Sequence, residues 1–68
     1  MNDETFNLSI RKFLKMVGVN SQREIEQAVT KAVAGGAIKG TEAFPANVTL
    51  EVAGLRLKVT FDGEIRLE

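Results

Sequence analysis

Residues 46–68 read ANVTLEVAGLRLKVTFDGEIRLE, and the spacing of their apolar side chains decides the fold class. Apolar residues recur at every second position, which is the period of a β-strand that buries one face. This period predicts three strands, over about 46–52, 55–61 and 64–68, joined as an antiparallel meander. The apolar positions are Ala46, Val48, Leu50, Val52, Leu55, Leu57, Val59, Phe61, Ile65 and Leu67.

The first connection sets the register of the first two predicted strands. A two-residue loop that begins at Ala53 would set Val52 opposite Leu55 and Glu51 opposite Arg56, a favourable charge pair. Such a turn requires a positive φ at Ala53, which residues with a Cβ atom adopt reluctantly. A four-residue loop would keep the register and avoid this conformation.

The second connection contains Asp62-Gly63, a dipeptide that favours a two-residue type I′ turn. That turn would place the apolar side chains of the last strand on the wrong face of the sheet. A three-residue loop over 61–63 restores the alternation and pairs Val59 with Ile65. We expect this longer loop, because the burial of large apolar side chains outweighs a turn preference.

Two helices are expected before the strands, at about 4–17 and 22–34, because apolar residues there recur every three or four positions. The glycine pair at 35–36 ends the second helix. The helical apolar positions are Phe6, Ile10, Phe13, Leu14 and Val17 in the first helix, and Ile25, Ala28, Val29, Ala32 and Val33 in the second.

Capping residues place a break between the two predicted helices. Asn2 or Asp3 can cap the start of the first helix, and Gly18 follows its last apolar residue, where an αL cap is favoured. Ser21 and Glu24 have the spacing of a capping box for the second helix. Residues 18–20 are therefore predicted to form a short turn.

Residues 37–45 form the predicted connector between the helices and the strands. Pro45 prevents a helix across this junction, and Ile38 and Phe44 are expected to tuck under the sheet edge. The predicted fold is a single domain over 1–68 of the α+β class, with element order α-α-β-β-β. Two layers are expected, in which the two helices cover the apolar face of the meander.

The composition excludes several kinds of site. The chain has 68 residues, nine basic and nine acidic side chains, and neither His nor Cys. Thiolate and imidazole chemistry is therefore absent, and we expect no catalytic, cofactor-binding or metal-binding residue. The net charge of +0 gives no general attraction to nucleic acid or to a membrane. With no apolar run of bilayer length and no signal-peptide pattern, the expected location is the cytoplasm.

One basic cluster lies on the first predicted helix, away from its apolar side. Arg11, Lys12 and Lys15 form this cluster, and with Arg23 they are candidate contacts for an anion or a nucleic acid. The simpler interpretation is a solvated helix face. Residues 13–25 also look like a helix-turn-helix, but their turn is one residue too long and the second helix is nearly neutral, which disfavours DNA binding.

Leu8 and Met16 lie off the apolar stripe of the first helix and are candidate contacts for a partner. The expected function is a non-enzymatic protein-interaction or self-associating module. The alternative is weak nucleic-acid binding by the helix pair. Pairing of two copies along strand 64–68 is disfavoured, because it would set Glu64 opposite Glu68.

Several stretches together resemble a known family. They are FNLSIRKFLK at 6–15, VGV at 17–19, SQREIE at 21–26 and DGEI at 62–65. This pattern is similar to a family of roughly 70-residue bacterial proteins catalogued only as a domain of unknown function. The resemblance implies a bacterial cytoplasmic protein of one domain, and it implies no activity and no functional residue.

Overall fold

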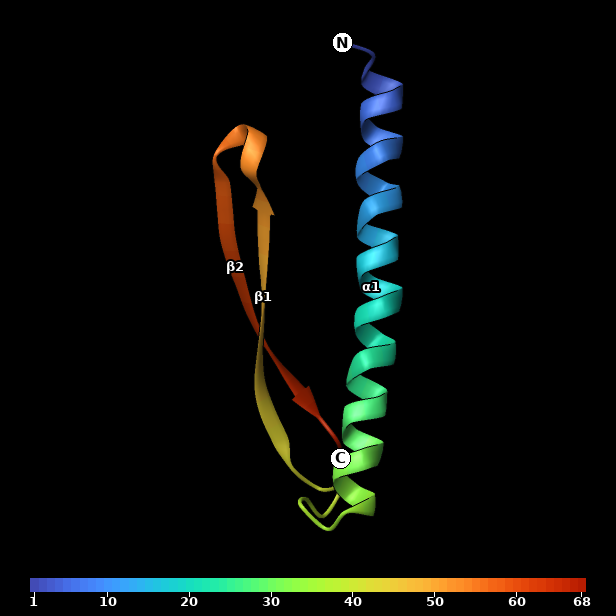
Figure 1. Cartoon of the computed structure of the whole chain (residues 1–68), viewed down its shortest axis with the longest axis vertical. Helices are drawn as coiled ribbons and strands as arrows, with labels where there is room; N and C mark the ends of the chain where they lie inside the picture. The colour runs from blue at the N-terminus through green and yellow to red at the C-terminus, as the bar shows by residue number, and fades with distance from the viewer. The chain divides into compact units, whose positions relative to one another are not determined.

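The computed structural model describes all residues, 1–68, and contains one helix and one hairpin (Figure 1). Helix α1 spans Asp3–Ala34, strand β1 spans Ala43–Val52, the 3-10 turn η1 spans Ala53–Leu55 and strand β2 spans Leu57–Arg66. The fold is α+β, as expected, but the predicted order of two helices and three strands is wrong. The chain divides into two compact units, Met1–Gly35 and Gly36–Glu68.

The two ends of α1 follow the sequence signals. Asn2 is the N-cap, and its side-chain Oδ1 accepts a hydrogen bond of 3.0 Å from the backbone N–H of Thr5. Acidic residues occupy the first turn and Lys31 the last, which complements the helix dipole. Gly36 then adopts a φ of 75°, a conformation that glycine reaches without strain and that ends the helix.

The predicted break at residues 18–20 is absent, because α1 continues through it. Ser21 lies inside the helix and caps nothing, while the Asn20 side chain donates a 2.8 Å hydrogen bond to the carbonyl oxygen of Met16. Continuity gives α1 one apolar stripe in place of two, with steps of three or four residues and Ser21 bridging its halves. The stripe consists of Phe6, Ile10, Leu14, Val17, Ser21, Ile25, Ala28 and Ala32. The capping preference is too weak to break the helix, because a break would remove the backbone hydrogen bonds at its centre.

Replacing Gly18 with Ala is expected to stabilise the protein by about 1 kcal/mol, since alanine has the higher helix propensity. A Cβ atom at Gly18 would meet no atom within 4 Å. Urea denaturation at a fixed protein concentration measures the change. Gly36→Ala is the matched control and should be destabilising, because its φ is positive. If Gly18→Ala also destabilises, then α1 breaks at this residue.

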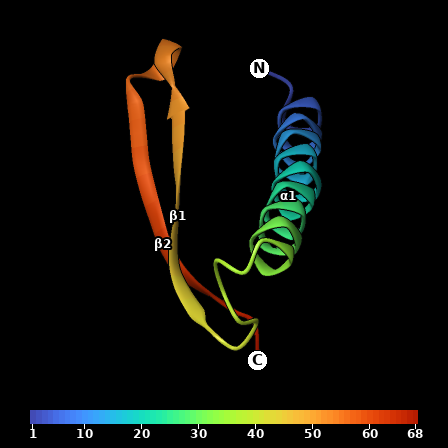
Figure 2. The same cartoon turned by 60° about the horizontal axis from the view of Figure 1, so that its bottom comes forward.

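The hairpin of β1 and β2 keeps the predicted faces but changes the predicted partners. Val52 lies opposite Leu57 rather than Leu55, and Glu51 lies opposite Lys58 rather than Arg56. The connection has four residues: η1 is followed by Arg56 in the αL conformation, with a φ of 53°. The two-residue loop is therefore wrong and the four-residue alternative is right in length. Both views show β1 and β2 running side by side (Figures 1 and 2).

The third predicted strand is in fact the end of β2. Asp62 and Gly63 form no turn and lie opposite Asn47 and Ala46. The reason is that β1 starts at Ala43, earlier than expected, so residues 62–66 have a partner along their whole length. Phe44 and Pro45, which were assigned to the connector, belong to β1.

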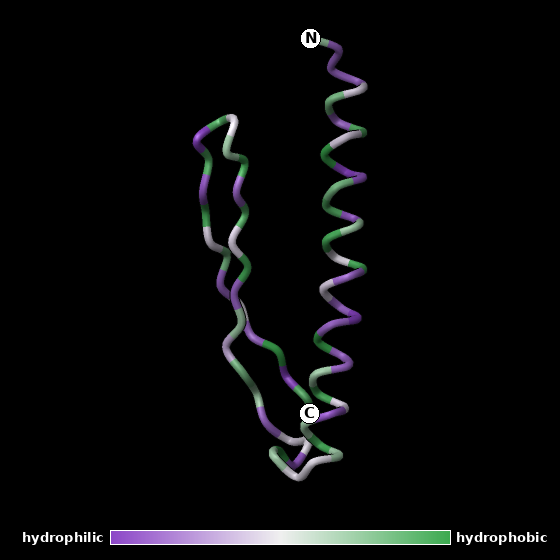
Figure 3. The backbone as a smooth tube through the Cα atoms, in the orientation of Figure 1, coloured by the Kyte–Doolittle hydropathy of each residue, from purple (hydrophilic) through white to green (hydrophobic).

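The register sorts the hairpin side chains into two faces of opposite character. The face that we call the apolar face consists of Phe44, Ala46, Val48, Leu50 and Val52 of β1, and Leu57, Val59, Phe61, Gly63 and Ile65 of β2. The opposite face carries polar pairs, among them Thr49 and Thr60, whose hydroxyl oxygens are 3.1 Å apart. Hydropathy accordingly alternates along both strands (Figure 3). No residue of the chain is fully buried.

Candidate interaction surfaces

The apolar face of the hairpin is the largest continuous apolar surface that the register creates. Phe61 remains 59% exposed and Val48, directly opposite, 50% exposed. A two-stranded hairpin has no second layer of its own and cannot bury a face by itself. Eight members of this surface were predicted from the sequence, although they were assigned to three strands. Phe44 and Gly63 were not predicted, whereas Leu55 and Leu67 were predicted but lie outside β1 and β2.

The two candidate partner contacts on α1 are both exposed. Leu8 is 57% exposed and Met16 is 52% exposed. They are eight residues apart on a continuous helix, so both lie on the same side, with Lys12 between them. Val19, three residues after Met16, is 51% exposed and lies on the same side.

The candidate basic contacts lie on the same helix. Arg11, Lys12, Lys15 and Arg23 are all exposed and none forms a salt bridge. Arg23 follows Lys12 by eleven residues, which is three helical turns and about 16 Å along the axis. The predicted second helix that was to carry Arg23 does not exist, so the helix-turn-helix interpretation fails.

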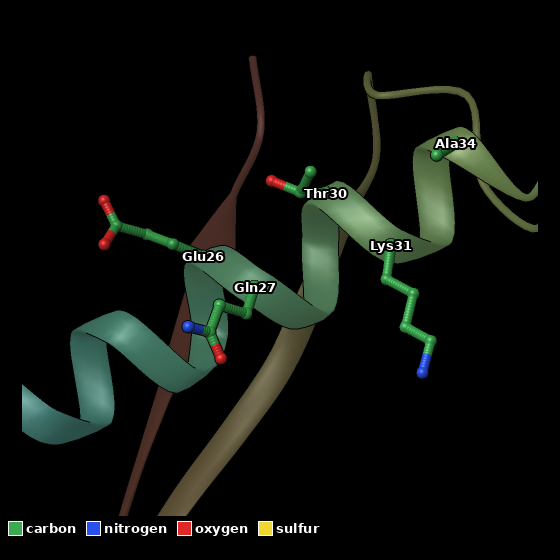
Figure 4. A pocket seen from close by; sticks show the side chains of 5 residues that line it. All are labelled: Glu26, Gln27, Thr30, Lys31 and Ala34. Carbon is green, nitrogen blue, oxygen red and sulfur yellow. The ribbon is translucent and has the colours of Figure 1, made fainter.

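A shallow hollow lies near the C-terminal end of α1 (Figure 4). The side chains that line it are Glu26, Gln27, Thr30, Lys31 and Ala34, and all of them are exposed. They belong to one helix, and the Glu26 carboxylate and the Lys31 ammonium point in different directions. The hollow therefore offers no set of polar groups aimed at a common point.

The side chain of Glu42 stabilises the turn before β1, a role that was not predicted from the sequence. Its carboxylate accepts backbone N–H hydrogen bonds from Lys39 at 2.8 Å, Gly40 at 2.9 Å and Thr41 at 3.1 Å. Gly40 supports this turn with a φ of 104°, which is open to glycine. The hydrogen bond from Lys39, followed by that from Gly40, lowers the pKa of Glu42. The sequence contained a signal for this turn, because Gly40 precedes the carboxylate of Glu42 by two residues.

Stability is expected to fall in acid because Glu42 is ionised in this turn. A carboxyl group with a lowered folded-state pKa contributes stability above its unfolded pKa of about 4.3, and that contribution disappears as the pH falls through the lower folded value. Urea denaturation at several pH values from about 6 to about 3 measures this contribution to the free energy of unfolding. The Glu42→Gln variant should lose this component of the pH dependence. An unchanged dependence in the variant would contradict the assignment.

Two further findings concern the whole chain. No helix combines the length and the apolar character that a membrane span requires. No three metal-ligating side chains gather into one group.

Comparisons with known proteins give one family and no individual relative. No curated protein and no solved structure matches the chain. One family model matches residues 1–68, under the description "Family of unknown function (DUF6494)". The match covers the entire sequence and confirms the resemblance seen in the sequence motifs. The chain therefore belongs to this family of unknown function.

Proposed function

We propose that this protein is a non-enzymatic module that self-associates through the apolar face of its hairpin. The observation that supports the proposal is the register, which places five alternate residues of β1 and five of β2 on one face, none of them charged. Exposed apolar patches of this kind mark interaction surfaces more often than they mark catalytic sites.

An isolated two-stranded hairpin is marginally stable in water, and a single helix cannot bury its own stripe. Covering the apolar face stabilises the hairpin by about 25 cal/mol for each Å² of apolar surface removed from water. A second copy of the chain supplies a surface of the same character, so its association would provide such a cover.

Sedimentation equilibrium at several protein concentrations tests the proposal. The expected result is a concentration-dependent dimer or higher oligomer that persists in high salt, because apolar association is not screened. A species that stays monomeric at every concentration would contradict the proposal.

Leu8 and Met16 form the second candidate contact, and a variant separates it from the hairpin. Leu8→Lys should leave the association constant unchanged if the apolar face forms the interface. A large loss of association would move the interface to α1 and confirm the contact that the sequence predicted.

Nucleic-acid binding by Arg11, Lys12, Lys15 and Arg23 remains the alternative. It would appear as binding of a labelled single-stranded or duplex oligonucleotide that weakens steeply as salt is raised. The proposed location is the cytoplasm of a bacterium, and the absence of Cys is compatible with that reducing compartment.

A further inference from the structure

We infer that two copies of this chain pair along the outer edge of β2, antiparallel and about a two-fold axis at Phe61, to form a four-stranded sheet. The order of strands would be β1-β2-β2-β1, with one continuous apolar face. The inference rests on the proposed self-association and adds to it a contact along the strand edge, which enlarges the apolar face and does not by itself cover it.

The first step is the direction of the backbone groups at the edge. Leu67 donates its N–H to the carbonyl oxygen of Glu42, 3.0 Å away, and these residues continue the register of the hairpin. Hydrogen-bonded and non-hydrogen-bonded pairs alternate along an antiparallel ladder, so Ile65 bonds inward to β1 and Glu64 does not. The N–H and C=O groups of the even-numbered β2 residues therefore point outward. These residues are Lys58, Thr60, Asp62, Glu64 and Arg66.

The second step distinguishes the two edges of the hairpin. Pro45 lies opposite Glu64 in a non-hydrogen-bonded pair, so its nitrogen faces the outer edge of β1. A proline there cannot donate to a further strand, and edge prolines are a common protection against pairing. The outer edge of β2 contains no proline over its ten residues. An added strand is therefore favoured at β2.

The third step selects the register by charge. A two-fold axis at Phe61 sets Lys58 opposite Glu64 twice, and Thr60 opposite Asp62 twice, over a ladder of residues 57–65. No pair within the ladder of residues 57–65 has like charges, and the one like-charge pair, Arg66 with Arg56, falls just beyond its end. It also pairs odd-numbered residues with odd-numbered ones, so the apolar faces of the two hairpins join.

Other two-fold registers are worse. An axis at Asp62 sets Lys58 opposite Arg66, and an axis at Gly63 sets Asp62 opposite Glu64, so each brings like charges together. An axis at Thr60 keeps opposite charges paired but shortens the ladder to residues 57–63. The expectation that edge pairing is disfavoured depended on a short last strand, 64–68, which the structure does not contain.

The fourth step concerns Gly63, because nothing within a single chain requires a glycine at this position. Its φ is not positive, and a Cβ atom added to it would meet nothing within 4 Å. Glycine inside a strand often marks the close approach of another group. In the Phe61 register, Gly63 lies opposite Val59 of the second copy and diagonal to its Phe61 ring, which can lie over the vacant position.

Single cysteines can test this register directly, because the natural chain contains none. Residue 61 would face its own copy in a non-hydrogen-bonded pair with a Cα separation of about 4.5 Å, which a disulfide spans. Phe61→Cys should therefore form a disulfide-linked dimer in oxidised glutathione. Val59→Cys and Gly63→Cys should cross-link when mixed, and neither should do so alone.

Paired charge variants test the same register without altering the apolar face. Glu64→Lys alone and Lys58→Glu alone should each weaken the dimer about tenfold, since each sets like charges opposite one another twice. An equimolar mixture of the two should recover dimerisation, because both charge pairs become complementary in the mixed dimer. Glu68→Lys is the matched control, lies outside β2 and should have no effect.

The outcomes separate this inference from the proposed function. Cross-linking at 61 and between 59 and 63, with recovery in the charge mixture, supports the β2 pairing. A dimer in sedimentation that shows neither result would overturn the pairing and leave self-association standing. A strictly monomeric protein would overturn both.

Discussion

Replacing Asn20 with proline is expected to destabilise the protein by about 3 kcal/mol and to lower its helix content. Asn20 lies in the middle of the 32-residue helix α1. Proline there removes the backbone N–H from the helix ladder, and its ring clashes with the carbonyl of Met16, which also accepts the Asn20 side chain. Circular dichroism measures the helix content, and urea denaturation at fixed concentration measures the stability.

The matched control places proline where a helix tolerates it. Asp3 is the first residue of α1 after the Asn2 cap, and Asp3→Pro should cost little, because that N–H has no partner within the helix. If Asn20→Pro were tolerated as well as Asp3→Pro, residues 18–20 would form the turn that the capping signals predict. The effect of one substitution therefore decides between one helix and two.

Replacing Leu50 with lysine should destabilise the protein by at least about 2 kcal/mol and shift it toward monomer. Leu50 is partly buried on the apolar face, opposite Val59. Truncation of a covered leucine alone costs about 2–5 kcal/mol, and a lysine adds a charge that must be removed from water when the face is covered. Denaturation at fixed concentration and sedimentation equilibrium measure the two effects.

Asn47→Lys introduces the same charge in the same strand but on the polar face. Asn47 lies opposite Asp62, so the new lysine gains a cross-strand partner and should be close to neutral. If both variants lose the same stability, then the two faces of the hairpin are equally solvated and the apolar face is not an interface. If only Leu50→Lys loses stability and association, the face is covered in the associated protein.

Most local features of the fold could be predicted from the residues that form them. The helix start at Asn2, the helix end at Gly35 and the alternation of Val48, Leu50 and Val52 all have strong local signals. The candidate contacts on α1, Leu8 and Met16, are exposed, but Leu14 on the stripe is as exposed as Met16, so exposure does not distinguish them. The free outer edge of β2 could not be predicted, because the predicted second strand ended at residue 61 and had a third strand paired along that side.

Two continuities were missed for the same physical reason. Gly18 and Asp62-Gly63 each carry a local preference for ending an element, worth about 1 kcal/mol. This preference is outweighed by the backbone hydrogen bonds that a continuous helix or strand keeps, about four or more at each of the two sites. A signal for continuation was present in both cases. Ser21 lies in phase with the apolar stripe, and Gly63 occupies an inward position between Phe61 and Ile65.

The sequence by itself determined that residues 4–17 and 22–34 are helical, that residues 46–52 and 57–61 are extended, and that alternate side chains of these strands share a face, because these features follow from periods of 3.6 and 2 that hold within each element. Only the tertiary structure decided that β1 starts at Ala43, that β2 runs to Arg66 and that Val52 pairs with Leu57. These features depend on pairing between residues up to 23 positions apart, as for Ala43 and Arg66. The free energy of such pairing is shared by the whole ladder, so no local signal within either strand specifies it.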